Sequence, residues 1–281
     1  MTTAVVLGNS SLPGGYGLLR LAAPEVAVSS LPGHFVHVNC GPGFTLPRPF
    51  SVFDADPEGG WIEILYKVVG AGSGAMAAWR VGDGVSFLGP IGRPFLTTLA
   101  RPSRALLIAG GVGLAPLDFL ARFLVRCGTE VHFFLGLEGE SPLPLTPGAG
   151  GALTLGRLGE LGIRVHLASR GERAGFFRGN VTDLVARVLA GGELGELAGT
   201  GVFVCGPMAM MRAAAALVGG YGLTGECSLE ERMGCGFGGC AGCVAPVRIG
   251  DGGEWEYRRV CVDGPVFPLD RVDWERGGAF R

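Results

Sequence analysis

The sequence predicts a multi-domain protein of the β and α/β classes: an N-terminal antiparallel barrel, a doubly wound parallel sheet and a small C-terminal cysteine-rich module. Three observations lead to this prediction. Residues 1–100 form short apolar segments between Gly and Pro, residues 101–224 alternate strand-like and helix-like segments, and residues 225–281 are irregular with four closely spaced cysteines. We expect the domain boundaries at these same positions.

The first region contains five strand-like segments: TAVVLG, YGLLRLAA, HFVHVNC, WIEILYKVV and GVSFLGP. Turn residues separate them, which is typical of a small antiparallel barrel. In the second region RALLIA, VHFFLG, RVHLAS and GVFVCG are apolar enough for buried strands, and helical segments lie between them. Such alternation predicts a parallel sheet. Residues 143–160 are rich in Gly and Pro, and we expect them to be mostly loop.

Composition excludes several classes of protein. The chain has 281 residues and a formal net charge of −2, so no basic field suggests nucleic acid as a partner. The most membrane-like run, Ala105–Val125, contains Pro116, Asp118 and Arg122, so we expect a strand, a turn and a helix rather than a membrane span. MTTAVVLGNSS lacks the features of a secretory signal, which predicts a cytoplasmic protein with reduced thiols.

Four of the eight cysteines have the spacing C-x4-C-x2-C-x17-C: Cys235, Cys240, Cys243 and Cys261. This is the ligand pattern of plant-type 2Fe–2S clusters. The glycines between them allow left-handed backbone and bring N–H groups close to sulfur. Structural zinc is the alternative, although zinc sites favour paired C-x2–4-C knuckles, whereas here Cys235 stands five positions before a C-x2-C and Cys261 is a single distant partner.

Two stretches of the first region are candidates for binding a phosphorylated ligand. Arg48-Pro49-Phe50-Ser51 follows a turn, where a guanidinium can hold a phosphate and a Ser hydroxyl can bond a heteroaromatic edge. A second strand with Leu65, Tyr66 and Lys67 leads to Gly72, Ser73 and Gly74. Ser73 precedes AMAAW and could direct a helix N-terminus at pyrophosphate. The alternatives are ordinary turns and a surface aromatic.

Two further stretches lie where strands of the parallel sheet end. GGVGLAP, at residues 110–116, joins a strand to a helix, the context of a nucleotide-binding turn. Pro116 stands at the last glycine position of the usual fingerprint, so we expect a related loop shaped by Gly111 and Gly113. Cys205-Gly206-Pro207 ends the last strand, at the edge where ligands bind. The Cys205 thiol could pack beside a nicotinamide or simply be buried.

In this order, the stretches RPFS, LYKVVGAGSG, LGPIGRPF, GGVGLAPL and VFVCGPMAMM resemble the ferredoxin–NADP reductase superfamily. SLEERMGCGFGGCAGCV and VCVDGPVF are similar to the cluster module of the electron-transfer subunits of type B dihydroorotate dehydrogenases. The resemblance covers nearly the whole chain. It implies an N-terminal flavin-binding barrel, a nucleotide domain, a C-terminal iron–sulfur module, and FAD, a 2Fe–2S cluster and NAD as cofactors.

The resemblance also implies roles for the residues singled out above. Arg48 would bind the FAD pyrophosphate, Ser51 would face the isoalloxazine, Tyr66 and Lys67 would lie along the FAD, and Gly72 to Gly74 would hold its phosphates. Gly111, Gly113 and Pro116 would shape the nicotinamide-nucleotide site, and Cys205 to Pro207 would border the nicotinamide. Ser51 and Cys205 are the residues nearest the chemistry, and the four cysteines would bind the cluster.

The implied function is that of an oxidoreductase subunit. Electrons would pass from a partner FMN-containing dihydroorotate dehydrogenase subunit through 2Fe–2S and FAD to NAD+ in pyrimidine biosynthesis, in a heterotetramer of two copies of each subunit. One alternative is a reductase subunit of another NAD(P)H redox complex, such as an NADPH–ferredoxin oxidoreductase. The other is a non-enzymatic module with a four-cysteine zinc site.

Overall fold

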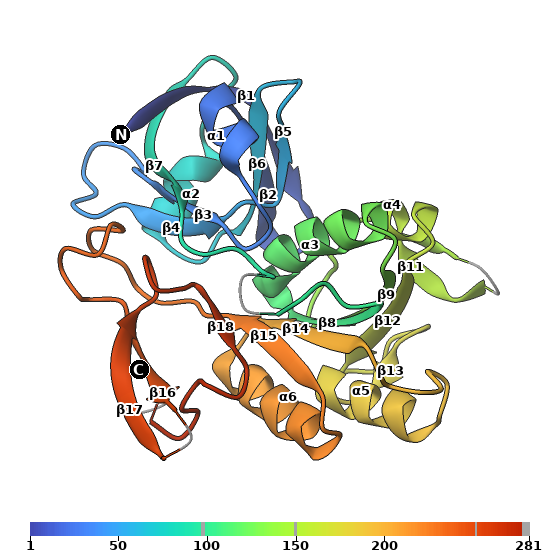
Figure 1. Cartoon of the computed structure of the whole chain (residues 1–281). Helices are drawn as coiled ribbons and strands as arrows, with labels where there is room; N and C mark the ends of the chain where they lie inside the picture. Colours follow the sequence, from blue (N-terminus) through green and yellow to red (C-terminus); the bar gives the residue numbers. More distant parts are fainter. Residues whose placement is uncertain (97–98, 149–150, 251, 277–281) are drawn as a thin grey trace.

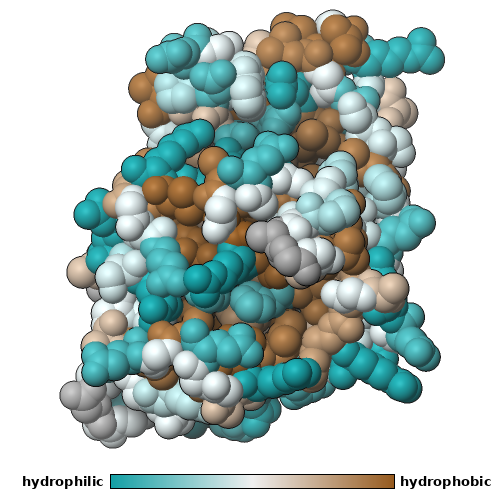
Figure 2. Space-filling view, turned by 90° about the vertical axis from the view of Figure 1, so that its right-hand side faces the viewer, coloured by the Kyte–Doolittle hydropathy of each residue, from teal (hydrophilic) through white to brown (hydrophobic). Residues whose placement is uncertain are grey.

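A computed structural model of the chain describes residues 1–96, 99–148, 151–250 and 252–276. The barrel lies at the top in Figure 1, the nucleotide-domain sheet lies below it, and the C-terminal lobe lies beside that sheet and under the barrel strands β3 and β4. Every helix among the described residues is too short or too polar to cross a bilayer. From the side, hydrophilic residues interrupt the hydrophobic patches of the surface (Figure 2).

The N-terminal domain is a seven-stranded sheet in which every pairing is antiparallel. In spatial order its strands are β4 (Arg48–Ser51), β3 (Phe35–Val38), β7 (Gly84–Ile91), β1 (Thr2–Leu12), β2 (Tyr16–Ala22), β6 (Trp61–Lys67) and β5 (Asp54–Asp56). Phe50 of β4 packs edge-on against Tyr66 of β6, 6.3 Å between ring centroids, so the sheet curls towards closure. The expected barrel is confirmed. Three short helices complete the domain: η1 (Pro13–Gly15), α1 (Pro24–Ser29) and α2 (Ala71–Ala77).

The second domain is a seven-stranded sheet, parallel except at one edge. Its spatial order is β13 (Phe177–Arg178), β12 (Arg164–Ser169), β9 (Glu130–Gly136), β8 (Arg104–Gly110), β14 (Thr200–Cys205), β15 (Thr224–Ser228) and β18 (Val266–Pro268). The turn η2 (Gly111–Gly113), α3 (Leu114–Arg126) and α4 (Gly156–Glu160) lie on the side towards the barrel, and α5 (Val181–Ala190) and α6 (Met208–Gly220) lie on the other (Figure 1). The sheet is therefore doubly wound, as expected.

Residues 143–160, which we expected to be mostly loop, contain regular structure. β10 (Leu145–Pro147) pairs antiparallel with β11 (Leu153–Leu155), and α4 follows directly. Leu155 and Leu158 are fully buried beside α3. Gly and Pro mark the turns of this hairpin, but its few apolar side chains reach the core and fix it there. The high glycine content of the segment hid this apolar pattern.

The C-terminal segment is interleaved with the nucleotide sheet. β15 pairs in parallel with β14, and β18 pairs antiparallel with β15, so the chain leaves the sheet after Ser228 and returns to it at Val266. The expected boundary at residues 224/225 therefore falls inside a strand. Between the two strands the chain forms a lobe containing the hairpin of β16 (Val244–Ile249) and β17 (Glu254–Arg259).

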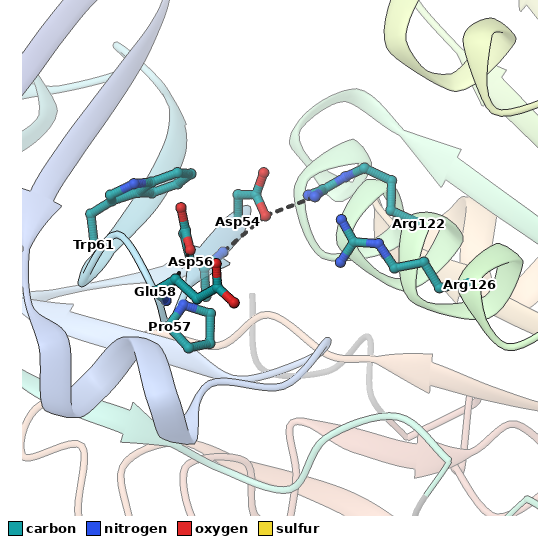
Figure 3. Close-up of a pocket in the computed structure, with 8 residues that line it drawn as sticks. Asp54, Asp56, Pro57, Glu58, Trp61, Arg122 and Arg126 are labelled. Atoms are coloured by element: carbon teal, nitrogen blue, oxygen red, sulfur yellow. Dashed lines mark hydrogen bonds and ion pairs between the residues drawn. The ribbon is translucent and has the colours of Figure 1, made fainter.

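A buried ion network joins the barrel to the nucleotide domain. Arg122 of α3 donates to Asp54 of β5 at 2.7 Å, to Asp118 at 2.9 Å and to the carbonyl of Phe53 at 2.8 Å. Arg157 of α4 pairs with Asp118 as well, and its guanidinium stacks over Phe53 at 4.0 Å. Beside this network lies a cavity of about 580 Å³, across which Arg122 and Arg126 face Asp54 and Trp61 (Figure 3).

Candidate functional site

The proposed phosphate-binding residues of the barrel meet at one corner. A Cβ on Gly72 would lie 3.5 Å from Cγ of Arg48, an ordinary contact, and a tighter 3.3 Å from Sγ of Cys40, so the first turn of α2 packs directly against Arg48 and Cys40. Arg48 is exposed, and its guanidinium donates to the carbonyls of Leu46 and Pro47. A fixed guanidinium beside a helix start suits a pyrophosphate.

Ser73 has a different part from the one expected. Its hydroxyl accepts hydrogen bonds from the N–H groups of Val69 at 3.0 Å and Gly70 at 3.3 Å and donates to the Gly70 carbonyl. This caps the start of α2. The side chain is buried and committed to the backbone, so the Ser73 hydroxyl shapes the turn at the start of α2.

Tyr66 also departs from expectation, because its ring lies in the barrel core. It is 2% exposed, its hydroxyl donates to Asn9 at 3.0 Å, and it packs over Gly17, where any Cβ would overlap the ring. Tyr66 therefore supports Phe50 from inside the barrel. The flanking residues differ: Leu65 is buried and Lys67 is exposed.

Strand β4 presents two different faces. Phe50 packs on the barrel core, as do Val36 and Val38 of the paired strand β3. Because side chains alternate along a strand, Ser51 and Pro49 point out of the barrel, together with their β3 partners Phe35 and His37. This outer face is directed at the nucleotide domain and the cluster lobe, where a flavin ring held by Ser51 would be within reach of both.

The two expected nucleotide loops meet at the carboxyl edge of the parallel sheet. β8 and β14 are neighbours in register up to Ala109 and Cys205. A Cβ on Gly113 would overlap the Cys205 carbonyl, and one on Gly206 would lie 2.9 Å from the Gly110 amide nitrogen. The glycines thus let two backbone segments touch and leave a concave edge open for a ligand. Pro116 is buried in the first turn of α3 and anchors that edge.

Only the backbone of Cys205 lies at this edge, because its side chain is buried. Its side chain is 1% exposed, and burial raises the pKa of the thiol well above its ordinary value. Cys227 on the adjacent strand is equally buried, and burial raises its pKa too. Burial thus disfavours the thiolate form of both residues, and the Cys205 thiol packs as a small apolar group in the core.

Tyr16, which no sequence motif indicated, lies between the barrel and the nucleotide loop. It lies at the start of β2, and its hydroxyl oxygen would lie 4.0 Å from a Cβ on Gly111, so it bridges the barrel and the nucleotide loop. Lys67 sits over its ring at 5.1 Å. Burial raises the pKa of Tyr16. No sequence signal distinguishes this Tyr from any other strand aromatic, because its role depends on a contact between domains.

The four cysteines of the lobe form two pairs. The amide of Cys240 donates to Sγ of Cys235 at 3.4 Å, and the two thiols also hydrogen-bond each other. Cys243 and Cys261 make a second thiol–thiol hydrogen bond. In the part of the chain that the structure describes, no three His, Cys, Asp or Glu side chains converge as one metal ion would require.

This pairing fits a two-iron cluster, in which each iron takes two protein ligands, better than a single tetrahedral zinc ion. The first pair lies towards solvent, with Cys240 exposed, and the second pair is buried. Burial opposes charge on Cys235, but N–H groups of Phe237 and Cys240 outweigh it and lower its pKa to about 6. Burial and the neighbouring Cys243 raise the pKa of Cys261 to about 12.

Comparison with protein families and curated relatives agrees with this geometry. The family model for the iron–sulfur cluster binding domain of dihydroorotate dehydrogenase B matches residues 230–273. The electron transfer subunit of dihydroorotate dehydrogenase B (NAD(+)) from Desulforamulus reducens is 36% identical over 260 residues, 92% of each chain. The subunit of the same description from Shouchella clausii is 35% identical over 257 residues, 90% of this chain and 91% of the relative.

Solved structures share the fold. The structure of an NADH-dependent reduced ferredoxin–NADP oxidoreductase superposes with a TM-score of 0.79 at 23% identity, covering 99% of this chain and 92% of that one. A ferredoxin NADP+ reductase from Neisseria gonorrhoeae with bound FAD and NADP gives a TM-score of 0.62 at 17% identity, covering 79% of this chain and 91% of that one.

Proposed function

Since the chain belongs to the family of electron-transfer subunits of dihydroorotate dehydrogenase B, we propose that it carries electrons from a separate dihydroorotate-oxidising subunit to NAD+. It is an oxidoreductase subunit with FAD, a 2Fe–2S cluster and NAD as cofactors. When bound, these groups supply one-electron transfer at the cluster, one- or two-electron transfer at the flavin and hydride acceptance at the nicotinamide.

The chain's own residues bind and orient these groups. We propose that Arg48 and the first turn of α2 hold the FAD phosphates, and that Ser51, on the outer face of β4, holds the isoalloxazine. The touching loops at Gly110–Gly113 and Cys205–Pro207 hold the nicotinamide nucleotide at the sheet edge. Phe50, supported by Tyr66, fixes the strand that carries Ser51.

The observation that carries the proposal is the pairing of the four thiols in a lobe packed against both other domains. Cys243 and Cys261 lie in one continuous apolar cluster with Phe35 of the barrel and with Leu106 and Ile108 of the nucleotide sheet. A cluster bound there would adjoin the outer face of β4 and the nucleotide domain at once. A structural zinc site would not need to lie between the flavin strand and the nucleotide domain.

Replacing Cys235 with Ser tests the proposal. We expect the variant to lose cluster absorbance and dihydroorotate:NAD+ turnover in the reconstituted complex, while NADH still reduces its FAD. Cys127→Ser is the matched control, because Cys127 ends α3 and is not in the lobe. Full partner-linked turnover in a cluster-free Cys235→Ser variant would refute the electron route.

We propose that the partner docks over the solvent-facing thiol pair. Phe237, between Cys235 and Cys240, is 67% exposed, an apolar ring beside an exposed ligand. The partner is expected to be the FMN-containing subunit, with two copies of each chain in a cytoplasmic heterotetramer. Phe237→Asp should weaken co-purification with that subunit and leave cluster absorbance intact, whereas Val28→Asp, at an equally exposed apolar residue of α1, should change neither.

A reductase subunit of another redox complex is the second candidate, because a ferredoxin–NADP oxidoreductase structure covers almost the whole chain. Isolation of the complex from its native source separates the two candidates. An FMN protein that oxidises dihydroorotate should accompany the chain. Isolation with a ferredoxin-reducing subunit, and no dihydroorotate oxidation, would favour the second candidate.

A further inference from the structure

Arg259, the last residue of β17, joins the three chain segments that carry the four cysteines. Its backbone is paired with the residue that follows Cys243 on β16, and the next amide along the chain donates to the Cys243 carbonyl at 2.7 Å. Cys261 lies two residues after Arg259. The guanidinium reaches the third segment, the loop between Cys235 and Cys240, where it donates to the carbonyl of Gly238 at 3.1 Å.

Asp263 fixes the Arg259 side chain from the other side of Cys261. Its carboxylate accepts from the backbone N–H of Arg259 at 2.9 Å and from Nε of the guanidinium at 3.3 Å, and the amide of Asp263 donates to the Arg259 carbonyl at 2.8 Å. The turn that carries Cys261 is therefore closed by this pair. The Arg259 side chain is 44% exposed, so the pair contributes orientation more than stability.

The Gly238 carbonyl belongs to a peptide group that is directed at a cysteine sulfur. The N–H of that peptide is the amide of Gly239, which hydrogen-bonds the thiol of Cys235. The amide of Gly238 itself hydrogen-bonds the thiol of Cys261. Gly238 has a left-handed φ of +87°, and a Cβ there would lie 3.4 Å from Nη1 of Arg259. The backbone of the loop thus packs directly against the guanidinium.

We propose that Arg259 is a positioning residue for the iron–sulfur cluster and raises its reduction potential. Through the Gly238 carbonyl it holds two amides on cysteine sulfurs, one in each thiol pair. The inference rests on the proposed function. Hydrogen bonds to the sulfurs help to set the potential of an iron–sulfur cluster, and a hydrogen bond to a peptide carbonyl polarises the N–H of the same peptide. Reduction adds negative charge, which these amides stabilise.

The test compares Arg259→Met, which keeps a long side chain without a donor, with Arg259→Lys, which keeps a charged donor, in the FAD- and cluster-loaded chain. We expect Arg259→Met to retain iron and FAD but to lower the cluster midpoint potential, shifting the cluster–flavin electron equilibrium about tenfold, or about 59 mV for one electron. The EPR g-values of the reduced cluster should shift with it. Arg259→Lys should restore most of the potential, and the FAD potential should stay unchanged.

Arg258→Met is the matched control, because it removes the same charge from the same strand. Side chains alternate along a strand, so Arg258 points to the opposite face, where it pairs with Glu256. This variant should leave the cluster potential and the g-values unchanged. Equal shifts in Arg258→Met and Arg259→Met would show an effect of net charge alone and would overturn the inference.

Wild-type potentials and g-values in both Arg259 variants would also overturn the inference, while leaving the proposed function intact. A wild-type chain without iron would instead overturn the proposed function itself. If Arg259→Met loses its iron, Arg259→Gln and Asp263→Asn decide, because each weakens the hold on the Gly238 carbonyl with a smaller change. Shifted g-values in these variants would support the inference, and wild-type g-values in both would refute it.

Discussion

The barrel meets the rest of the molecule at two junctions built in opposite ways. Against α3 and α4 the contact is made by charges: Arg122 and Arg157 bind Asp118, which is fully buried, and Arg122 also binds Asp54. Against the cluster lobe it is made by rings, with His37 on Gly236 and Phe35 among the apolar residues around Cys243 and Cys261.

The difference indicates what each junction does. Buried charges are stable only when every partner is in place, so the first junction fixes the orientation of the nucleotide domain on the barrel. Rings and a glycine exclude water and set the polarity around the thiols, so the second junction controls the surroundings of the cluster. The following predictions go from the largest expected effect to the smallest.

Arg122→Ala should break the charged junction. It leaves the Phe53 carbonyl and Asp54 without this donor and Asp118 with Arg157 alone, and we expect it to lower the free energy of unfolding by about 3–5 kcal/mol. Urea denaturation measures the loss. Arg170→Ala, which removes an exposed pair with Glu138, should leave the denaturation midpoint nearly unchanged. Equal costs would show that the network does not hold the domains.

Gly236→Ala should break the ring junction. The left-handed φ costs about 1–2 kcal/mol and the overlap with His37 about 1 kcal/mol more, and iron content per chain should fall. Gly250→Ala is the control, since Gly250 has φ +63° but nothing within 4 Å of its Cβ. Adding His37→Ala to Gly236→Ala should restore the part of the unfolding free energy that the overlap with the His37 ring had removed. If the two glycine variants are equally stable, the ring contact contributes nothing.

The His166→Phe comparison isolates the contribution of the nucleotide domain to acid sensitivity. His166 stacks on Phe134 at 4.4 Å, and burial lowers its pKa to about 4, below the ordinary 6.5. The unfolded chain therefore binds the proton more readily, so stability is constant above pH 6.5 and falls as the pH drops towards 4, by about 2 kcal/mol after allowing for partial exposure. Denaturation between pH 7 and 4 should show this slope in the wild type and a shallower one in His166→Phe. If the wild type and His166→Phe lose stability equally steeply between pH 7 and 4, groups other than His166 cause the acid sensitivity.

Tyr66→Phe should have the smallest effect, because it changes neither junction. Losing the hydrogen bond to Asn9 should cost about 1 kcal/mol in urea denaturation, with FAD content unchanged because the ring still supports Phe50. Tyr221→Phe, at an exposed ring after α6, should cost nothing measurable. Loss of FAD from Tyr66→Phe would contradict the placement of Tyr66 as an internal support.

The succession of domain types could be predicted because each depends on local pattern. Alternating apolar segments predicted β8, β9, β12 and β14 with the helices α3 and α5, and the spacing of four cysteines identified the lobe. The hairpin at residues 145–155 was missed because three-residue strands carry too little periodicity to be detected. The roles expected of Ser73 and Tyr66 at the FAD remain predictions, and the local pattern did not show that both side chains are buried.

By itself, the sequence determined the order of the three modules and the residue types that can bind phosphate, nicotinamide and iron, since these follow from periodicity and spacing over a few residues. Only the tertiary structure decided that the lobe starts and ends in the nucleotide sheet, that Tyr16 reaches Gly111, and that His37 packs on Gly236. Such contacts join residues far apart in the chain. They depend on how whole domains pack, which leaves no local trace in the sequence.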